Sequence, residues 1–261
     1  MDTGDARMSL PSRSNLAHHW PLDPQTVFLN HGSFGATPSE VLEEQGRLRG
    51  LLERDPVRFF EREYSDMWDE SRSAVARMLN ADVDGMVFVS NATQGVNTVL
   101  RSLDLEPGDE IIVPDHSYQA CWNAVDYVTR RSGAKTVVVE IPFRVEDPKQ
   151  VIDLIMEAVT ERTVLALIDT VTSPTGSRMP FEELTNRLQS RGVDVLLDAA
   201  HGPGIVPIDL SRLEPAYCVG NFHKWTCSPK GSAFLHIRKD RKDLIHPLNF
   251  AKKQLRKLVQ K

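Results

Sequence analysis

Short apolar runs alternate along the chain with longer segments in which apolar residues recur every three or four positions. Several of the short runs are continuous rather than alternating, which is typical of strands buried on both faces. The short runs predict strands at 86–90, 110–114, 135–141, 163–169, 194–200, 216–222 and 232–238. The periodic segments predict helices at 39–52, 62–79, 95–103, 119–132, 147–160 and 181–191.

This rhythm of strand and helix predicts an α/β fold with a mostly parallel sheet covered on both sides. The reason is that neighbouring parallel strands need a connection of about ten or more residues, which is usually a helix. Ligands of such sheets bind beside the carboxyl ends of the strands. Functional residues are therefore expected directly after each predicted strand.

The composition is that of a globular protein, with 261 residues, 41% of them hydrophobic and 26% charged. No apolar run reaches the roughly 18 residues that a membrane-spanning helix needs. Acidic residues stand in the N-terminal segment where a secretory signal would have an apolar stretch. We therefore expect a cytoplasmic protein with no membrane partner.

Cysteine and charge patterns argue against other classes of protein. Cys121, Cys218 and Cys227 are too scattered for a disulfide framework, and no spacing typical of a metal site is present, so no metal is expected. The formal net charge of -5 argues against a nucleic-acid partner. Residues 237–261 nevertheless carry nine Lys and Arg and two Asp, and this basic end is either an amphipathic helix on an acidic partner or a solvated tail.

One strand-to-helix turn has the character of an anion site. Residues 90–95 read Ser-Asn-Ala-Thr-Gln-Gly and precede an apolar-periodic helix. Unpaired N–H groups and the positive end of a helix favour an anion such as phosphate, and Thr93 could add a hydroxyl donor. The alternative is a simple helix N-cap.

Asp198 ends an otherwise apolar strand. A buried carboxylate is costly unless a cation or hydrogen-bond donors meet it. A positively charged ring nitrogen is one such partner, and the N–H groups of the neighbouring loop are the alternative.

Lys224 follows another strand and stands between His223 and Trp225. In a partly desolvated site a lysine becomes an amine nucleophile for carbonyl compounds. The alternative is a surface lysine with its charge in water. Together, an anion-binding turn, an acidic strand end and a lysine are the parts needed to hold a phosphorylated pyridine aldehyde.

These motifs resemble those of the class V branch of the fold-type I enzymes that use pyridoxal 5'-phosphate (PLP). Within it, the sequence is similar to the isopenicillin N epimerase-like group, which is related to the cysteine desulfurases. The resemblance covers roughly 26–238, in the segments FLNHGSFGATP, SNATQGVNT, PGDEIIVPDHSYQA, TSPTG, DAAHGPG and GNFHKWTCSPKGSAFLHIR. It implies a three-layer α/β/α large domain of a PLP-dependent transferase, with a seven-stranded, mostly parallel sheet, PLP as cofactor and a homodimeric assembly.

The resemblance also implies roles for single residues. Lys224 would form the Schiff base with PLP and then shuttle a proton at the substrate α-carbon, and Asp198 would pair with the protonated pyridine nitrogen. These two are the candidate catalytic residues. The phosphate would be bound by Ala92, Thr93, Asn221 and His223.

Further residues are implied around the pyridine ring and the substrate. One alignment favours Tyr118 for stacking on the ring, and another alignment of the same segment gives His116. Ser173 is the candidate contact to the ring hydroxyl and His201 a second polar contact, although both could be turn residues. The residues expected near the substrate are Asn30, His31 and Gly32.

The chain departs from the family pattern near residues 238–245. Relatives continue into a small C-terminal domain that supplies an arginine for the substrate carboxylate, whereas the final 16 residues, HPLNFAKKQLRKLVQK, do not follow that pattern. We therefore expect an N-terminal extension over 1–25, a PLP-binding large domain over 26–245 and a basic tail over 246–261 in place of the small domain.

The leading hypothesis is a PLP-dependent enzyme that acts at the α-carbon of an amino acid or amine, of the epimerase, aminotransferase or lyase type. The alternative is a catalytically inert paralogue that binds PLP or a full-length homologue. Persulfide chemistry is disfavoured because Cys227, close to the lysine, is expected to be structural. A nucleotide-binding protein is also disfavoured, because no glycine-rich nucleotide motif follows any predicted strand.

Overall fold

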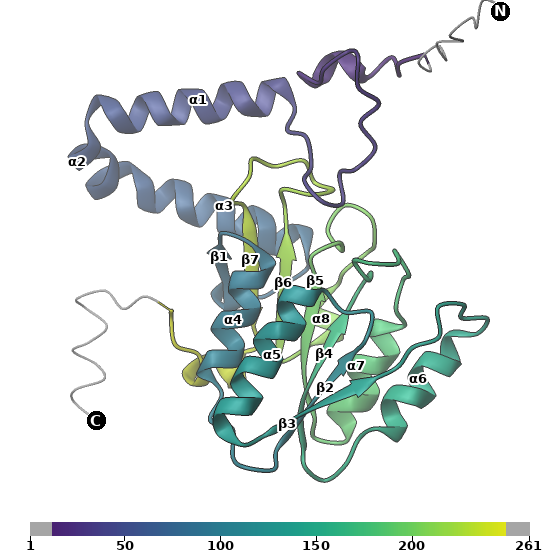
Figure 1. The fold of residues 1–261 in the computed structure, drawn as a ribbon. Coiled ribbons are helices and arrows are strands. Elements are labelled where there is room, and N and C mark those ends of the chain that lie inside the picture. Colours follow the sequence, from purple (N-terminus) through teal and green to yellow (C-terminus); the bar gives the residue numbers. More distant parts are fainter. Residues whose placement is uncertain (1–11, 249–261) are drawn as a thin grey trace, which may run out of the picture.

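One seven-stranded sheet forms the centre of the computed structural model, which describes residues 12–248 (Figure 1). The strand order is β1-β7-β6-β5-β4-β2-β3. The strands are β1 Met86–Val89, β2 Glu110–Pro114, β3 Lys135–Val139, β4 Thr163–Asp169, β5 Asp194–Ala199, β6 Tyr217–Asn221 and β7 Ala233–Ile237. All seven strands predicted from the sequence are confirmed, and the sheet is mostly parallel, as predicted.

The direction of the strands brings several loops to one edge of the sheet. Strand β7 is antiparallel to both of its neighbours, β1 and β6, so the other six strands run in the same direction. The carboxyl ends of β1, β2, β4, β5 and β6 therefore share an edge, and the turn that precedes β7 lies at the same edge. Polar residues after five separate strands can meet there.

Helices cover both faces of the sheet, and the predicted three-layer α/β/α fold is confirmed (Figure 1). One face carries α4 and α5, and the other carries α6, α7 and the short α8. These helices are α4 Ala92–Ser102, α5 Gln119–Ser132, α6 Pro148–Glu157, α7 Phe181–Ser190 and α8 Leu210–Leu213.

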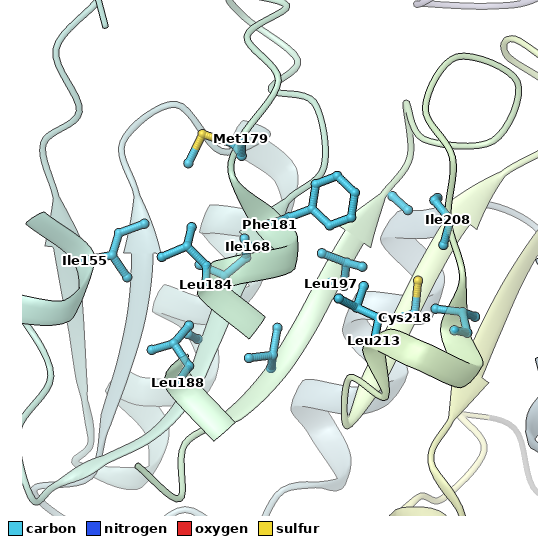
Figure 2. Packing of buried hydrophobic residues seen from close by; sticks show 14 of the residues in the cluster. Ile155, Ile168, Met179, Phe181, Leu184, Leu188, Leu197, Ile208, Leu213 and Cys218 are labelled. Carbon is cyan, nitrogen blue, oxygen red and sulfur yellow. The ribbon is translucent and has the colours of Figure 1, made fainter. Parts of the chain in front are cut away.

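The helical layers bury apolar faces on the sheet. On α7, Phe181, Leu184 and Leu188 recur at helical spacing and pack in one cluster with Ile168 of β4 and Leu197 of β5 (Figure 2). All five side chains are almost fully inaccessible to solvent. A second cluster lies under α4 and α5. The central strands are thus covered on both faces, which explains their continuous apolar runs.

Helix α4 begins at Ala92, three residues before the start predicted from its apolar periodicity. Asn91 caps the helix, because its side-chain oxygen accepts the N–H of Gln94 at 2.7 Å. Periodicity alone does not detect this first turn, since its residues are small and polar. Ala92 and Thr93 consequently lie in the helix rather than in the preceding loop.

N-terminal helices form an arm that extends away from the sheet and returns to it beside β1 (Figure 1). The predicted helix over 62–79 is the last part of a longer helical run that begins at Pro56, because Asp55 accepts the Arg58 N–H at 3.0 Å and a proline occupies the first helical turn. The elements of the arm are α1 Ser39–Arg54, α2 Pro56–Arg58, a π-helical turn Phe59–Glu63 and α3 Tyr64–Met78.

Short 3-10 helices lie at Ala17–His19, Val83–Gly85 and Lys239–Leu244. Within residues 12–248, no helix has the length and apolar character required to cross a membrane. Most of the predicted basic tail falls on residues 249–261, which lie outside the described part of the chain.

Candidate active site

A cavity of about 900 Å³ lies at the edge of the sheet where the carboxyl ends of the parallel strands meet. Its walls come from the residues that follow β1, β2, β4, β5 and β6, from the turn before β7 and from an N-terminal segment. Two of the predicted site residues, His31 and His116, do not line it. The other predicted residues all do: Asn30, Gly32, Ala92, Thr93, Tyr118, Ser173, Asp198, His201, Asn221, His223 and Lys224.

Asp198 lies in β5, next to its carboxyl end, and is only 3% exposed. Its Oδ1 accepts the Ala200 N–H at 2.9 Å, and its Oδ2 accepts the Cys121 thiol at 3.3 Å. Burial raises the pKa of Asp198, while these two donors and the nearby charge of Lys224 lower it. Among residues 12–248 no cationic side chain forms an ion pair with this carboxyl. A cationic ligand would therefore be stabilised beside it.

A second acid, Asp169, lies next to Asp198 across the pairing of β4 with β5. It is also 3% exposed, and its Oδ2 accepts the Ser117 hydroxyl at 2.6 Å. Burial, and then the negative charge of Asp198, raise the pKa of Asp169 well above its usual range. Asp169 is therefore the member of the pair that keeps a proton.

Lys224 lies after β6, and its Nζ is 3.0 Å from Nε2 of His201. The other ring nitrogen of His201, Nδ1, accepts the indole N–H of Trp225 at 3.3 Å. Burial lowers the pKa of Lys224, and the charge of Asp198 opposes this shift only in part. Burial also lowers the pKa of His201 to about 4, so its ring is neutral at pH 7. The surroundings thus favour an uncharged, nucleophilic amine over the alternative of a solvated surface lysine.

The first turn of α4 presents an unused N–H group to the cavity. The N–H of Ala92 is donated to Oδ1 of Asn221 at 2.8 Å, and that of Gln94 to Asn91. The N–H of Thr93 has no protein acceptor among the hydrogen bonds of residues 12–248. The N-cap and the anion site considered from the sequence are therefore compatible, because the cap leaves this donor at the positive end of the helix.

Two side chains beside this turn keep polar atoms free for a ligand. His223 donates through Nδ1 to the carbonyl of Ser232 at 2.9 Å, since a carbonyl can only accept. Within the described segment, Nε2 of His223 forms no hydrogen bond to the protein. Burial lowers the pKa of His223. Asn221 uses its amide oxygen for Ala92 and keeps its NH₂ group as a donor.

Tyr118 and His116 differ in their relation to the cavity. Tyr118 is the N-cap residue of α5, is 45% exposed and lines the cavity. The His116 side chain is only 14% exposed, with its Nε2 at 4.0 Å from Asp115. Ser173 lines the cavity from the turn after β4, which is closed by a Gly176 N–H bond to a carbonyl at 2.9 Å. Of the two candidate stacking rings, the one at the cavity is Tyr118.

An N-terminal strap, residues 30–37, is fixed on the loop that carries Lys224. The Gly35 N–H donates to the carbonyl of His223 at 2.8 Å, and Lys230 Nζ donates to the carbonyl of Gly35 at 2.5 Å. Asn30 and Gly32 line the cavity from this strap. The His31 ring does not, and its Nδ1 instead accepts the Ala36 N–H at 3.3 Å.

The sequence analysis did not predict four residues that contact predicted site residues or the strap: Cys121, Asp169, Trp225 and Lys230. Asp169 ends an apolar strand as Asp198 does, so the same signal could have identified it. The thiol of Cys121 reaches Asp198 only because α5 packs on this face of the sheet, against β2 and β3, which no local sequence signal reports.

Comparison with known proteins gives a family match. Residues 38–258 match the family described as aminotransferase class-V. The match continues past residues 238–245, so the expectation that the resemblance ends there is wrong. Isopenicillin N epimerase of Streptomyces clavuligerus is 33% identical over 229 residues, which are 87% of this chain and 57% of that protein.

A second relative is named for a different activity from that of the epimerase. The probable chloroplastic L-cysteine desulfhydrase of Arabidopsis thaliana is 34% identical over 254 residues, covering 90% of this chain and 53% of that protein. The chain therefore spans little more than half the length of these two curated relatives.

Solved structures are similar in fold. A mutant of C-DES with glycine covalently linked to the PLP cofactor superposes with a TM-score of 0.78 and 24% identity, over 94% of this chain and 66% of that one. The cysteine desulfurase CsdA of Escherichia coli gives a TM-score of 0.77 and 24% identity, over 90% and 60%.

Proposed function

Because this chain belongs to the class V aminotransferase family, a PLP-dependent family, we propose that it binds PLP in the cavity through a Schiff base with Lys224 and acts at the α-carbon of an amino acid or amine. One observation carries the proposal. Lys224, whose surroundings favour the uncharged amine, and Asp198, a buried carboxyl with no cationic partner among residues 12–248, line the same cavity from the ends of neighbouring strands.

The residues of the cavity fit the chemical groups of PLP. The buried Asp198 carboxyl suits a protonated pyridine nitrogen, because each charge supplies the partner that the other needs out of water. Burial lowers the pKa of Lys224 and so favours its uncharged amine, the form that reacts with an aldehyde. A volume of about 900 Å³ is within the range of small-molecule sites and leaves room for a substrate beside the cofactor.

The phosphate group fits the first turn of α4. Thr93 supplies a hydroxyl and an N–H that has no acceptor within the described part of the protein, and Asn221 supplies its NH₂ group. His223 is oriented by its bond to Ser232, so Nε2 is the atom that would take up a proton next to a dianion. Ala92 contributes to the proposed phosphate site indirectly, because its N–H holds Asn221 in position.

The remaining residues orient the ring and the substrate. Tyr118 would stack on one face of the pyridine, and Ser173 and His201 would contact its polar edge. Asn30 and Gly32 of the strap would lie beside the substrate.

When bound, PLP stabilises negative charge at the α-carbon of an amine joined to it. Lys224 would move the proton at that carbon, and Asp198 would keep the ring nitrogen protonated. The strap would limit the access of water to both.

The proposed substrate is an amino acid or amine, and removal of its α-proton is the step that epimerases, aminotransferases and lyases of this kind share. The relatives named as an epimerase and a cysteine desulfhydrase support this common step. By the same family resemblance we infer a homodimer.

The test measures exchange of the α-proton with solvent. The purified chain is loaded with PLP in D₂O and incubated with a panel of L- and D-amino acids, and loss of each α-proton signal is followed by NMR. The proposal expects a visible absorption band on loading and exchange with at least one amino acid, both absent from Lys224→Ala. A band without exchange would identify a cofactor-binding chain without turnover, and the absence of a band would overturn the proposal.

A further inference from the structure

Trp225 follows Lys224 directly, and the proposed function gives it no role. Its indole Nε1 is 3.3 Å from Nδ1 of His201, and on the other side of the imidazole Nε2 is 3.0 Å from Nζ of Lys224. Both Trp225 and His201 line the cavity. The three side chains form one continuous hydrogen-bonded chain at its wall.

The donor character of the indole N–H fixes the direction of the two hydrogen bonds that join Trp225, His201 and Lys224. An indole N–H donates and does not accept, so Nδ1 of His201 must be the acceptor and carry no proton. A neutral imidazole of this kind has its single proton on Nε2, which therefore donates towards Lys224. A lysine ammonium has three donors and no acceptor, so only the uncharged amine can receive this hydrogen bond.

We propose that Trp225 is a positioning residue that, by fixing the tautomer of His201, holds Lys224 as a free amine. The inference rests on the proposed function of Lys224. In that function the amine must be uncharged both to bond with the aldehyde and to accept the α-proton.

The charges around Lys224 give a reason why the free amine needs this additional hydrogen bond. Burial lowers the pKa of Lys224, whereas the negative charge of Asp198 favours the ammonium form. The imidazole of His201 stays neutral over the whole neutral range because burial lowers its pKa to about 4. The titratable groups that face Lys224 are Asp169, Asp198, Cys121, His201 and His223. Among them, the neutral imidazole is the group that donates a hydrogen bond to the uncharged amine.

The tautomer of His201 is the first readout, and it needs no cofactor. The chain is labelled with ¹⁵N-histidine, and long-range ¹H–¹⁵N spectra are recorded without PLP. Signals of His201 are assigned by their loss in His201→Gln. The inference expects a protonated Nε2 and a bare Nδ1 in the wild type, and a shift of the proton towards Nδ1 in Trp225→Phe. A wild-type proton on Nδ1 would overturn it.

The reactivity of the Lys224 amine is the second readout. Acetic anhydride labels uncharged amines, and peptide mass spectrometry gives the labelled fraction at Lys224 in the chain without PLP at pH 7. Loss of one hydrogen bond is worth roughly a three- to tenfold change, so Trp225→Phe should label more slowly by about that factor. Equal labelling would contradict the inference.

Two variants test whether the effect of Trp225→Phe on Lys224 labelling is due to the hydrogen bond with His201 or to loss of an indole in general. Trp68→Phe also removes an indole, one that packs edge-on against Phe88 at 4.9 Å between ring centroids and does not line the cavity, and should leave labelling of Lys224 unchanged. His201→Gln should label like the wild type, because its amide oxygen can accept from Trp225 while its NH₂ group donates to the amine. Failure of PLP to attach to Lys224 would overturn the proposed function. Unchanged labelling in Trp225→Phe with PLP attached to Lys224 in the wild type would overturn only the inference.

Discussion

Asp169 and Asp198 are direct neighbours across strands β4 and β5, and each is only 3% exposed. Asp169 accepts a hydroxyl from Ser117, whereas Asp198 accepts a backbone N–H and the thiol of Cys121. Two adjacent buried carboxyls rarely ionise together, since each charge raises the pKa of the other. The pair thus combines a neutral acid, Asp169, with a carboxylate, Asp198, that is available to a cation.

This difference predicts unequal effects of two isosteric substitutions. Asp169→Asn replaces a neutral acid with a neutral amide and should change PLP affinity by less than about threefold. Asp198→Asn removes the charge that meets the pyridine nitrogen, and a buried charged hydrogen bond is worth about 2 kcal/mol or more, so affinity should fall by at least about tenfold. Titration of the visible absorption band with PLP measures both, and equal losses would count against the assignment.

The strap predicts that Gly35→Ala is disruptive. A Cβ at this position would lie well inside contact distance of the Lys224 carbonyl oxygen and 2.8 Å from that of His223, and both atoms belong to the backbone. The free energy of unfolding should fall by about 2 kcal/mol or more, and PLP affinity with it.

Gly46→Ala is the matched control for Gly35→Ala. Gly46 lies within α1, and a Cβ at this position would have no neighbouring atom within 4 Å, so alanine should stabilise the helix by about 0.5–1 kcal/mol. Urea unfolding of both variants gives the comparison. A Gly35→Ala variant as stable as the wild type would show that the strap is not fixed on the Lys224 loop.

We expect the buried His236 to make the protein less stable in mild acid. His236 in β7 is 5% exposed, and neither ring nitrogen has a hydrogen-bond partner within the described residues. Burial lowers its pKa to about 4 from the ordinary value of 6.5. The unfolded chain therefore binds a proton as pH falls below about 6.5 while the folded chain does not, and the free energy of unfolding should fall by about 3 kcal/mol by pH 4.

Urea unfolding between pH 7 and pH 4 measures this dependence. His236→Leu should flatten the pH profile by about that amount. His201, whose pKa is also lowered to about 4, adds a slope of the same sign that His236→Leu keeps. An unaltered profile in His236→Leu would refute the prediction.

Substitution of Cys227 tests whether its thiol is structural or acts as a nucleophile. Its φ of 55° is in the left-handed region that glycine adopts without strain, and burial raises the pKa of its thiol. Cys227→Gly should therefore keep α-proton exchange and either maintain stability or raise it by up to about 1 kcal/mol. Abolished exchange with an intact fold would instead identify a reactive thiol.

The sequence predicts those parts of the fold and site that local pattern controls. Strand β5 is an apolar run because both of its faces are covered, and Asp198 and Lys224 stand out because each follows such a run. Parallel strands then bring their carboxyl ends to one edge, so residues more than twenty positions apart meet at a single cavity.

The rest depends on packing between elements, which the pattern does not encode. The family resemblance implies a His31 ring near the substrate, but the bond from the Ala36 N–H holds that ring outside the cavity lining. The hydrogen bond from Trp225 to His201 depends on the path of the loop after β6 relative to the loop after β5. The early start of α4 at Ala92 follows from the cap supplied by Asn91, which apolar periodicity does not report.

The most direct test of the central claim is the identity of the lysine that bonds to PLP. The chain is loaded with PLP and reduced with borohydride, and its peptides are analysed by mass spectrometry. The account predicts a phosphopyridoxyl group on Lys224, and none on that residue's peptide in Lys224→Ala. A phosphopyridoxyl group on Lys230, which also lines the cavity, or on no lysine at all, would contradict it.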